Sequence, residues 1–246
     1  MMTERALSFG AAAARYDRHR PSYPEAALRW ALGDRPLRVV DLGAGTGILA
    51  RVLARLGHEV IPVEPDEAMR AQFVQATPGL APLAGRAEEI PLPDGYADAV
   101  VAGQAYHWFD PEPTHAELAR VLRPGGRFAP LWNSRDDTVP WVAALSGIVD
   151  DALAGRGIRD PEPALDSFGD AFSPPERAAF RHHVRHTPES LLAMVTTRSY
   201  YLVSPPRTRA ELEQAVRDLC ATHPDLAGKD SFDLPYETIV YRATRR

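Results

Sequence analysis

Cysteine and lysine are almost absent from this chain of 246 residues, which contains one of each, Cys220 and Lys229. A single cysteine excludes an intrachain disulfide and a thiolate metal cluster. Lys229 lies between Gly228 and Asp230, a polar setting that predicts a solvated side chain rather than a Schiff-base nucleophile. The chemistry of the chain therefore has to come from other side chains.

Long hydrophobic runs and basic clusters are lacking as well. No stretch approaches the roughly 20 consecutive apolar residues of a membrane helix, and the first residues lack the apolar core of a signal peptide. The formal net charge is −5, and no basic run stands out apart from Arg245-Arg246. We therefore expect a cytoplasmic protein without a membrane or nucleic-acid partner, acting on a small molecule.

Strand and helix patterns alternate regularly through the first half of the chain. Strands are expected at 37–41, 60–63, 80–83, 97–102 and 127–132, with helical patterns between them. This order predicts a right-handed, mostly parallel, doubly wound α/β sheet. We find no internal repeat or low-complexity linker, so the chain is expected to form one domain.

A glycine-rich turn, Gly43-Ala44-Gly45-Thr46-Gly47, follows the first expected strand and precedes a helix that begins at Ile48. Glycines let a ligand approach the backbone closely, and the N–H groups at the start of a helix attract polar ligands. Glu64 ends the second strand about 20 residues after the turn, the offset at which an acid bonds ribose hydroxyls. The pattern predicts a nucleoside-cofactor site.

The details of this turn argue against a dinucleotide. Ile48 stands where the G-x-G-x-x-G pattern needs its third glycine, and Asp41 would lie close to a pyrophosphate that carboxylates repel. An acid at this position favours a ligand that carries an amino group. A nicotinamide-dependent oxidoreductase stays as the less favoured alternative.

The chain changes character outside 37–132. Before it, helices are expected at 11–20 and 24–33. After it, we expect a helix at 139–154, a surface excursion at 155–175 and an edge strand at 180–186. Two more helices are expected, one after Thr187 and one after a capping box formed by Thr208 and Glu211. A last strand is expected at 236–243. His182, His183 and His186 suggest a metal site, but strand alternation sends His183 to the opposite face, so no metal is expected.

The sequence resembles the class I S-adenosylmethionine-dependent methyltransferases. The resemblance rests on residues 39–47, Glu64, 87–91 and the 123–126 turn; Tyr16 to Pro24, Gln104 to Asp110 and 234–236 look like the small-molecule branch related to ubiquinone/menaquinone and trans-aconitate enzymes. It implies a seven-stranded Rossmann-like sheet with helices on both faces, a lid at 1–33, a cofactor-binding core at 37–132 and a substrate-side helical insertion at 139–235. The implied reaction is one-step methyl transfer to a small-molecule acceptor, giving S-adenosylhomocysteine.

The resemblance also implies roles for individual residues. The expected contacts with S-adenosylmethionine are Tyr16, Arg20, Asp41, Gly43, Ala44, Gly45, Gly47, Glu64, Pro65, Met69, Ala87, Glu88, Gln104 and Ala105. The acceptor pocket is expected to involve Tyr106, Trp108, Phe109, Trp132, Asn133 and Trp141. Arg86 stands where the family often has an acid, so the contact with the adenine amino group passes to Glu88.

Several of these residues have a structural alternative. His107 is the candidate general base, and a packed or supporting position is an equal alternative. Trp108 and Phe109 can belong to the pocket wall or the core, core packing is the default for Trp132, Asn133 and Trp141, and Arg20 can form a plain surface ion pair. A protein of the same fold that binds the cofactor without transferring a methyl group also stays open. The acceptor and the oligomeric state are not identified by the sequence.

Overall fold

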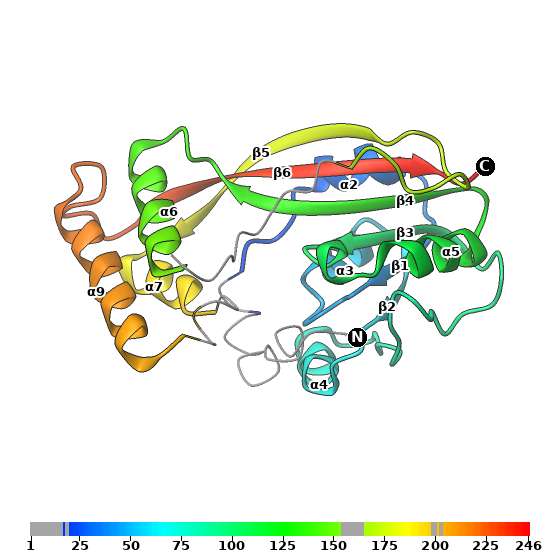
Figure 1. Ribbon diagram of the computed structural model, residues 1–246, viewed down its shortest axis with the longest axis horizontal. Helices are drawn as coiled ribbons and strands as arrows, with labels where there is room; N and C mark the ends of the chain where they lie inside the picture. Colours follow the sequence, from blue (N-terminus) through cyan, green and yellow to red (C-terminus); the bar gives the residue numbers. More distant parts are fainter. Residues whose placement is uncertain (1–16, 18–19, 154–164, 198–200, 202–203) are drawn as a thin grey trace.

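A six-stranded mixed sheet carries the fold (Figure 1). The computed structural model describes residues 17, 20–153, 165–197, 201 and 204–246. The strands are β1 (Arg38–Leu42), β2 (Glu59–Val63), β3 (Ala97–Gly103), β4 (Leu122–Arg135), β5 (Glu176–His186) and β6 (Phe232–Thr244), in the order β2-β1-β3-β4-β6-β5. The first four strands pair in parallel, and β6 pairs antiparallel with both β4 and β5.

Helices cover both faces of the sheet. They are α2 (Glu25–Leu32), α3 (Ile48–Arg55), α4 (Glu67–Ala76), α5 (Pro111–Val121), α6 (Pro140–Leu153), α7 (Pro188–Val195) and α9 (Pro206–Thr222), with a 3-10 turn at Tyr106–Trp108. The helix expected at 11–20 lies outside the described residues except at Asp17 and Arg20. The doubly wound α/β expectation is thus confirmed.

Neighbouring residues of the parallel strands point to opposite sides and are buried on both. In β1, Val39 packs with α2 and α3 on one face, whereas Val40 packs with α5 on the other. Val100 and Val101 of β3 divide in the same way. A strand buried on both faces reads as a continuous apolar run, which is why β3 could be recognised in the sequence.

The expected strand at 80–83 is reduced to a bridge, so the described sheet has six strands rather than seven. Leu83 pairs with Val63 beyond β2, donating its N–H to the Pro62 carbonyl and accepting from Glu64 N. Pro82, immediately before it, has no N–H to extend the pairing. Where a seventh strand was expected beside β2, a single residue, Leu83, pairs with the sheet.

The three long strands β4, β5 and β6 run from the parallel part of the sheet toward α6, α7 and α9, which gather at one end of the molecule (Figure 1). A separate hydrophobic cluster forms there, with Val142, Leu191, Val216 and Tyr236 among its buried members. Residues 123–126 bulge out of the pairing between β3 and β4 as the expected tight turn. The strand expected at 236–243 is longer than expected, because β6 begins at Phe232.

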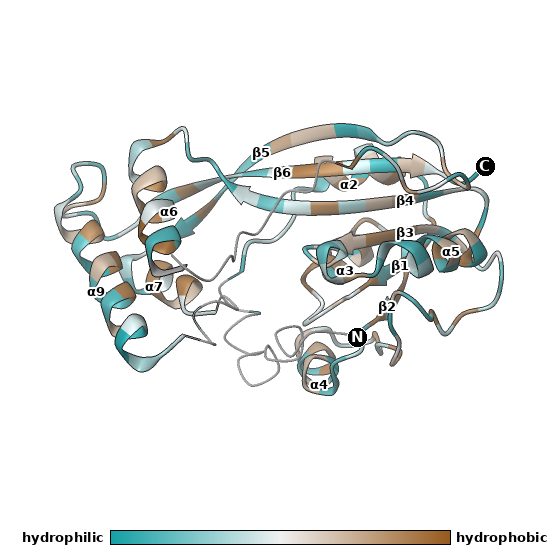
Figure 2. Cartoon of the chain, viewed as in Figure 1, coloured by the Kyte–Doolittle hydropathy of each residue, from teal (hydrophilic) through white to brown (hydrophobic). Residues whose placement is uncertain are grey.

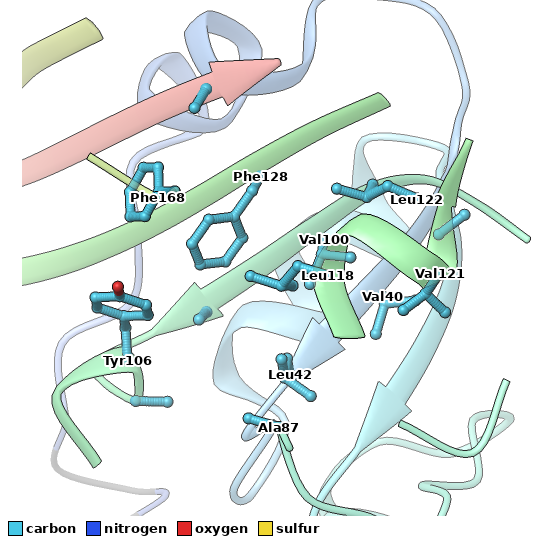
Figure 3. Close-up of a cluster of buried hydrophobic side chains, with 14 of the residues drawn as sticks. Val40, Leu42, Ala87, Val100, Tyr106, Leu118, Val121, Leu122, Phe128 and Phe168 are labelled. Carbon is cyan, nitrogen blue, oxygen red and sulfur yellow. The ribbon is translucent and has the colours of Figure 1, made fainter. Parts of the chain in front are cut away.

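Two expectations for the second half of the chain are wrong. Within 155–175, residues 154–164 lie outside the described part, but Phe168 and Phe172 are buried in the core instead of lying on the surface. Figure 3 shows Phe168 beside Phe128 and Tyr106. The capping box at Thr208 does not form either, because α9 begins at Pro206 after Pro205 and has no side-chain cap. The helix start at Thr187 is confirmed, with Ser190 as its capping partner.

The helices carry apolar residues toward their packed side and polar residues outward (Figure 2). In α9, Leu212, Val216 and Leu219 are buried in the cluster with α6 and α7, and Glu211 and Arg217 are exposed. Among the described residues, no helix combines the length and the hydrophobicity that a membrane span requires.

Candidate active site

A pocket lies at the carboxyl ends of β1, β2 and β3, the edge of a parallel sheet where ligands bind in this architecture. It encloses about 790 Å³ of empty space, including its open mouth. Its lining comprises Leu42, Gly43, Gly45, Glu64, Pro65, Met69, Gly85, Arg86, Ala87, Glu88, Gly103, Gln104, Ala105, Trp108 and Phe109.

The glycine turn forms the floor of this pocket. Its Gly43 and Ala44 N–H groups both donate to the Val63 carbonyl, at 2.9 and 3.1 Å, which fixes the turn against the end of β2. Gly43 has φ +72°, and a Cβ added there would lie 2.7 Å from the Ala105 Cβ. Only glycine therefore lets the turn and the end of β3 approach this closely.

Glu64 connects the turn to β2 and is buried. Its two carboxylate oxygens accept hydrogen bonds from Gly45 N at 2.8 Å and Asp66 N at 2.9 Å. Burial raises the pKa of Glu64, and the two backbone hydrogen bonds oppose this rise. The side chain is fixed in place, and each oxygen keeps a lone pair for a ligand hydroxyl.

Asp41 is the second buried carboxyl group of the site, and its oxygens lack the hydrogen bonds that the Glu64 oxygens accept. Only 1% of it is exposed, and neither oxygen accepts a hydrogen bond from the described residues. Burial, together with the charge of Glu64, raises the pKa of Asp41 to about 7, and the Ala50 backbone N–H opposes this rise in part. A smaller hollow lies beside it, lined by Tyr23, Asp41, Gly43, Ala44, Gly45, Thr46, Ile48, Leu49 and Gly103. This hollow shares three glycines with the main pocket, so the two spaces adjoin at the glycine turn.

The end of β3 contributes a strained residue to the pocket wall. Gln104 has φ +54° and is the only non-glycine residue with positive φ in the described chain. Its side-chain Nε2 donates to the Asn133 carbonyl at 2.8 Å, and its backbone N–H donates to Leu131 O at 2.9 Å. Two bonds to β4 thus hold this unusual conformation, a kind of strain that accumulates at functional sites.

His107 faces β4 rather than the pocket. Trp132 Nε1 lies 3.3 Å from His107 Nδ1, and because an indole nitrogen can only donate, Nδ1 is the acceptor. The neutral ring then carries its proton on Nε2, so Nε2 cannot act as the base that the sequence suggested. The geometry favours the alternative, supporting role of His107.

The expected acceptor residues separate into two groups. Trp108 and Phe109 line the pocket. Tyr106 turns into the core, where its hydroxyl lies 2.7 Å from His115 Nε2 and its ring packs on Phe128 and Phe168 (Figure 3). Phe109 connects the two groups, because it lines the pocket and its ring also packs edge-on against Tyr106, with 5.9 Å between the ring centroids.

Other expected site residues also lie away from the pocket lining. Trp141 is buried against Phe232 in the helical cluster, in contrast to the acceptor pocket expected for it. Gly47, with φ +88°, faces Phe73 and Thr77, so it serves the packing of α3 on α4. Arg20, Tyr106, His107, Trp132 and Asn133 are outside both linings, and Tyr16 lies outside the described residues.

Sequence reasoning missed an ion pair between Asp17 and Arg51 of α3, next to the glycine turn. Arg51 Nη2 lies 2.6 Å from Asp17 Oδ1, and Thr46 Oγ1 donates to the same oxygen at 2.8 Å. Arg51 also donates to the Thr46 carbonyl at 3.0 Å. No spacing rule joins residues 34 positions apart, so the sequence contained no signal for this contact.

Arg86, Ala87 and Glu88, the segment for which an adenine contact is expected, line the pocket, and that contact stays a prediction. Arg86 lines the pocket and forms a 3.6 Å ion pair with Glu89. Glu88 also lines the pocket and accepts from Asp110 N at 3.1 Å. Across the described ranges no group of three or more histidine, cysteine, aspartate or glutamate side chains is arranged to hold a metal ion.

Comparisons with known proteins agree on one family. A family profile described as a methyltransferase domain matches residues 40–129. An uncharacterized methyltransferase of Mycobacterium tuberculosis is 43% identical over 242 residues, covering 97% of this chain and 96% of the relative. The demethylmenaquinone methyltransferase of Beutenbergia cavernae is 39% identical over 114 residues, 46% of each chain. A solved structure described as a type II methyltransferase, from Anaeromyxobacter dehalogenans, has a TM-score of 0.63 at 27% identity and covers 92% of this chain and 97% of its own.

Proposed function

The chain belongs to the class I S-adenosylmethionine-dependent methyltransferases, and from this premise we propose that it uses S-adenosylmethionine to methylate a small-molecule acceptor. The observation that carries the proposal is the pair of buried carboxyl groups around the glycine turn. Glu64 offers hydrogen-bond acceptors to ribose hydroxyls at the end of β2. Asp41, without a hydrogen-bond donor among the described residues, offers a charge partner to an amino group.

The remaining lining fits the other parts of this cofactor. Pro65, Met69 and Ala87 provide an apolar slot beyond Glu64 that suits a purine base. Gly43 and Ala105 both line the pocket and approach closely, which a Cβ at Gly43 would prevent. The same residues suit a dinucleotide poorly, because Asp41 would face a pyrophosphate.

When bound, S-adenosylmethionine supplies a methyl group on a cationic sulfur, and transfer breaks the sulfur–carbon bond as the acceptor's nucleophile bonds the methyl carbon, leaving neutral S-adenosylhomocysteine. The protein's contribution is alignment and exclusion of water, a proximity effect. Trp108 and Phe109 form an apolar wall for this step. No proton transfer is assigned to His107, given its hydrogen bond from Trp132.

Three observations support a small acceptor. The net charge of −5 gives no electrostatic basis for binding nucleic acid. The pocket wall next to Gln104 is aromatic, which suits an apolar or conjugated molecule. The partial relative from Beutenbergia cavernae is named for a demethylated quinone, which places a small molecule among the acceptors of the wider family. A cytoplasmic location stays a prediction.

Calorimetry with S-adenosylmethionine, S-adenosylhomocysteine and NAD tests the cofactor. We expect both adenosyl ligands to bind and Glu64→Gln to weaken both by about tenfold or more, because hydrogen bonds to charged groups are worth about 1.5–3 kcal/mol. Glu67→Gln, an exposed neighbour outside the pocket, is the matched control and should bind like the wild type. Binding of NAD without either adenosyl ligand would overturn the proposal.

The acceptor is tested separately with a methyl-labelled cofactor. Incubation with a panel of quinols, phenols, carboxylic acids and amines should transfer label to one chemical class. Transfer to RNA or protein, with no small molecule labelled, would contradict the acceptor part of the proposal and leave the cofactor part intact.

A further inference from the structure

The long strands β4, β5 and β6 share a face that is apolar at both ends and polar in the middle. At the parallel end Leu131 and Val240 pack with α2 and α3, and at the far end Leu234 belongs to the helical cluster. Directly paired residues of neighbouring strands lie on the same face, and the pairing has no register shift between these ends. The polar residues between the two ends therefore form one surface.

The first polar row of this face is a closed hydrogen-bond network. Asn133 Nδ2 donates to the Ser22 carbonyl at 3.1 Å, and its Oδ1 accepts from Thr238 Oγ1 at 2.6 Å. His182 Nε2 lies 3.3 Å from the same Oδ1 and must be the donor, because an amide oxygen only accepts. Ser22 precedes Tyr23, which lines the smaller hollow at the glycine turn. The network thus connects this face to the proposed cofactor site.

The second polar row contains Arg135, whose charge is not balanced. The register places Arg135 opposite Tyr236, which pairs in turn with His182. Between the two apolar ends, no other described residue of this face carries a fixed charge. The Arg135 side chain is half-buried, and it forms no ion pair and no hydrogen bond with the part of the chain that the structure describes.

The acids that follow Arg135 in the sequence are engaged elsewhere. Asp136 accepts from the N–H of Thr138 at 3.1 Å and from its hydroxyl at 2.5 Å. Asp137 accepts from Ser146 Oγ at 2.7 Å. A positive charge that is partly withdrawn from water costs free energy unless it has a partner. The packing of the described residues gives no reason for an arginine at this position.

Arg135 lies beyond the edge of the sheet at which the cofactor pocket is located. β3 ends at Gly103, which pairs with Leu131, whereas β4 continues past it to Arg135. In the pocket wall, Gln104 Nε2 donates to the Asn133 carbonyl at 2.8 Å. Arg135 is two residues further along β4, or about 7 Å of strand. A molecule a few ångströms longer than this can contact Arg135 and the pocket wall at once.

We propose that Arg135 binds a carboxylate of the methyl acceptor and thereby holds the acceptor beside the cofactor pocket. The inference rests on the proposed function, because it takes this pocket to contain the methyl donor. A guanidinium pairs with a carboxylate through two parallel hydrogen bonds, which fix the orientation of the bound acid. One fixed positive charge matches the single negative charge of a carboxylate, so a monocarboxylic acid is the expected class of acceptor.

Calorimetry in the presence of saturating S-adenosylhomocysteine tests the site without turnover. The probes are matched pairs of an acid and its uncharged amide: benzoate and benzamide, cinnamate and cinnamamide, hexanoate and hexanamide. We expect at least one acid to bind about tenfold or more tightly than its amide, because charge-assisted hydrogen bonds are stronger than neutral ones. Equal binding of acid and amide in every pair, or binding of no acid, would overturn the proposal.

Substitution of Arg135 tests whether this residue is responsible. Arg135→Met removes the charge and retains an extended side chain, so the affinity for the acid should fall about tenfold or more, with that for S-adenosylhomocysteine unchanged. Arg135→Lys keeps the charge without the paired N–H groups and should lie in between. The control is Arg181→Met: Arg181 is exposed and, one residue before His182, lies on the opposite face. Equal losses in Arg135→Met and Arg181→Met would contradict a specific site.

Transfer of a labelled methyl group connects binding to the reaction. The acid that binds most tightly should accept the label, and Arg135→Met should raise its KM by a larger factor than it lowers kcat. Labelling of uncharged acceptors at equal rates by the wild type and Arg135→Met, with no acid labelled, would overturn the inference and leave the proposed function intact. A wild type that binds no S-adenosylhomocysteine would overturn the proposed function itself. Thermal unfolding verifies that each variant is folded.

Discussion

At the scale of single residues, the two buried carboxyl groups of the site differ in the hydrogen bonds that their oxygens accept. Glu64 receives hydrogen bonds from two backbone N–H groups, whereas Asp41 receives none from the described residues. Both are buried, so each favours the protonated form more than it would in water. The Ala50 backbone opposes only part of the rise in the pKa of Asp41, so Asp41 should dominate the pH dependence of stability.

Replacing Asp41 by asparagine should remove a loss of unfolding free energy that the wild type undergoes as the pH rises from about 4 to about 7. The pKa of Asp41 is raised from 3.8 to about 7, so between these values the unfolded state is ionised while the folded state holds the proton. Its contribution to stability is therefore present below about pH 4, falls as the pH rises to about 7 and is constant above. Urea unfolding at pH 8 should find Asp41→Asn more stable than the wild type by a few kcal/mol, with little difference at pH 4.

The control for this measurement is Asp230→Asn, since Asp230 is exposed in the loop before β6. It should follow the wild type at both pH values. A difference between Asp41→Asn and the wild type that is the same at pH 4 and pH 8 would contradict burial of an ionisable Asp41.

Two glycines of the turn should respond differently to alanine. Both have positive φ, +72° at Gly43 and +55° at Gly45, so each substitution should cost about 1 kcal/mol of backbone strain. Only at Gly43 would the new Cβ meet another atom, Ala105 Cβ at 2.7 Å; nothing lies within 4 Å at Gly45. Gly43→Ala should be the less stable variant and should lose more cofactor affinity, measured by thermal unfolding and calorimetry. Equal effects would show that the close approach at Gly43 is relieved by movement.

At the scale of elements, the two helix starts in the second half of the chain form a matched pair. Thr187 caps α7, accepting from Ser190 N at 3.2 Å, while Thr208 lies inside α9 and caps nothing. Loss of a side-chain cap costs about 0.5–2 kcal/mol. Thr187→Ala should therefore lower the free energy of unfolding by about 1 kcal/mol, and Thr208→Ala by much less. The reverse order in denaturant titrations would contradict the assigned helix starts.

The buried segment around Phe168 connects the described stretch after α6 to the main core. Phe168 is 0% exposed and packs against Tyr106, His115 and Phe128. Phe168→Ala should cost about 3–5 kcal/mol in unfolding free energy, as for other buried phenylalanines. Asp166→Ala, exposed in the same segment, is the control and should be close to neutral. A small effect of Phe168→Ala would place this segment outside the cooperative core.

How much could be predicted from the sequence depends on the range of the interaction. Periodicity identified β1, α3, β2, α4 and β3, because the burial of a regular element repeats along the chain, and the glycine turn with Glu64 located the pocket. The contacts of Gln104 with Asn133, of Arg51 with Asp17 and of Tyr106 with His115 depend on how distant segments are packed. The proline-rich stretch around Phe168 has no periodicity at all, so its burial could not be anticipated.

At the scale of the whole molecule, one end of the sheet carries the pocket and the other end packs against helices. The parallel end carries the pocket, and the antiparallel strands β4, β5 and β6 extend from it to the helical cluster (Figure 1). Asn133 lies on β4 between these parts and receives contacts from β5 and β6. Asn133 thus connects β4, β5 and β6 at the residue whose main-chain carbonyl accepts from Gln104 in the pocket wall.

The position of β5 at the edge of the sheet has a consequence for the protein in concentrated solution. A strand edge exposes backbone groups that can pair with a second molecule, and charged residues discourage this. The outward-facing side chains of β5 include Arg177, Arg181, His183 and Arg185, all exposed. Two copies that met edge to edge would bring like-charged guanidinium groups together. The exposed arginines of β5 should therefore discourage edge-to-edge pairing of two molecules.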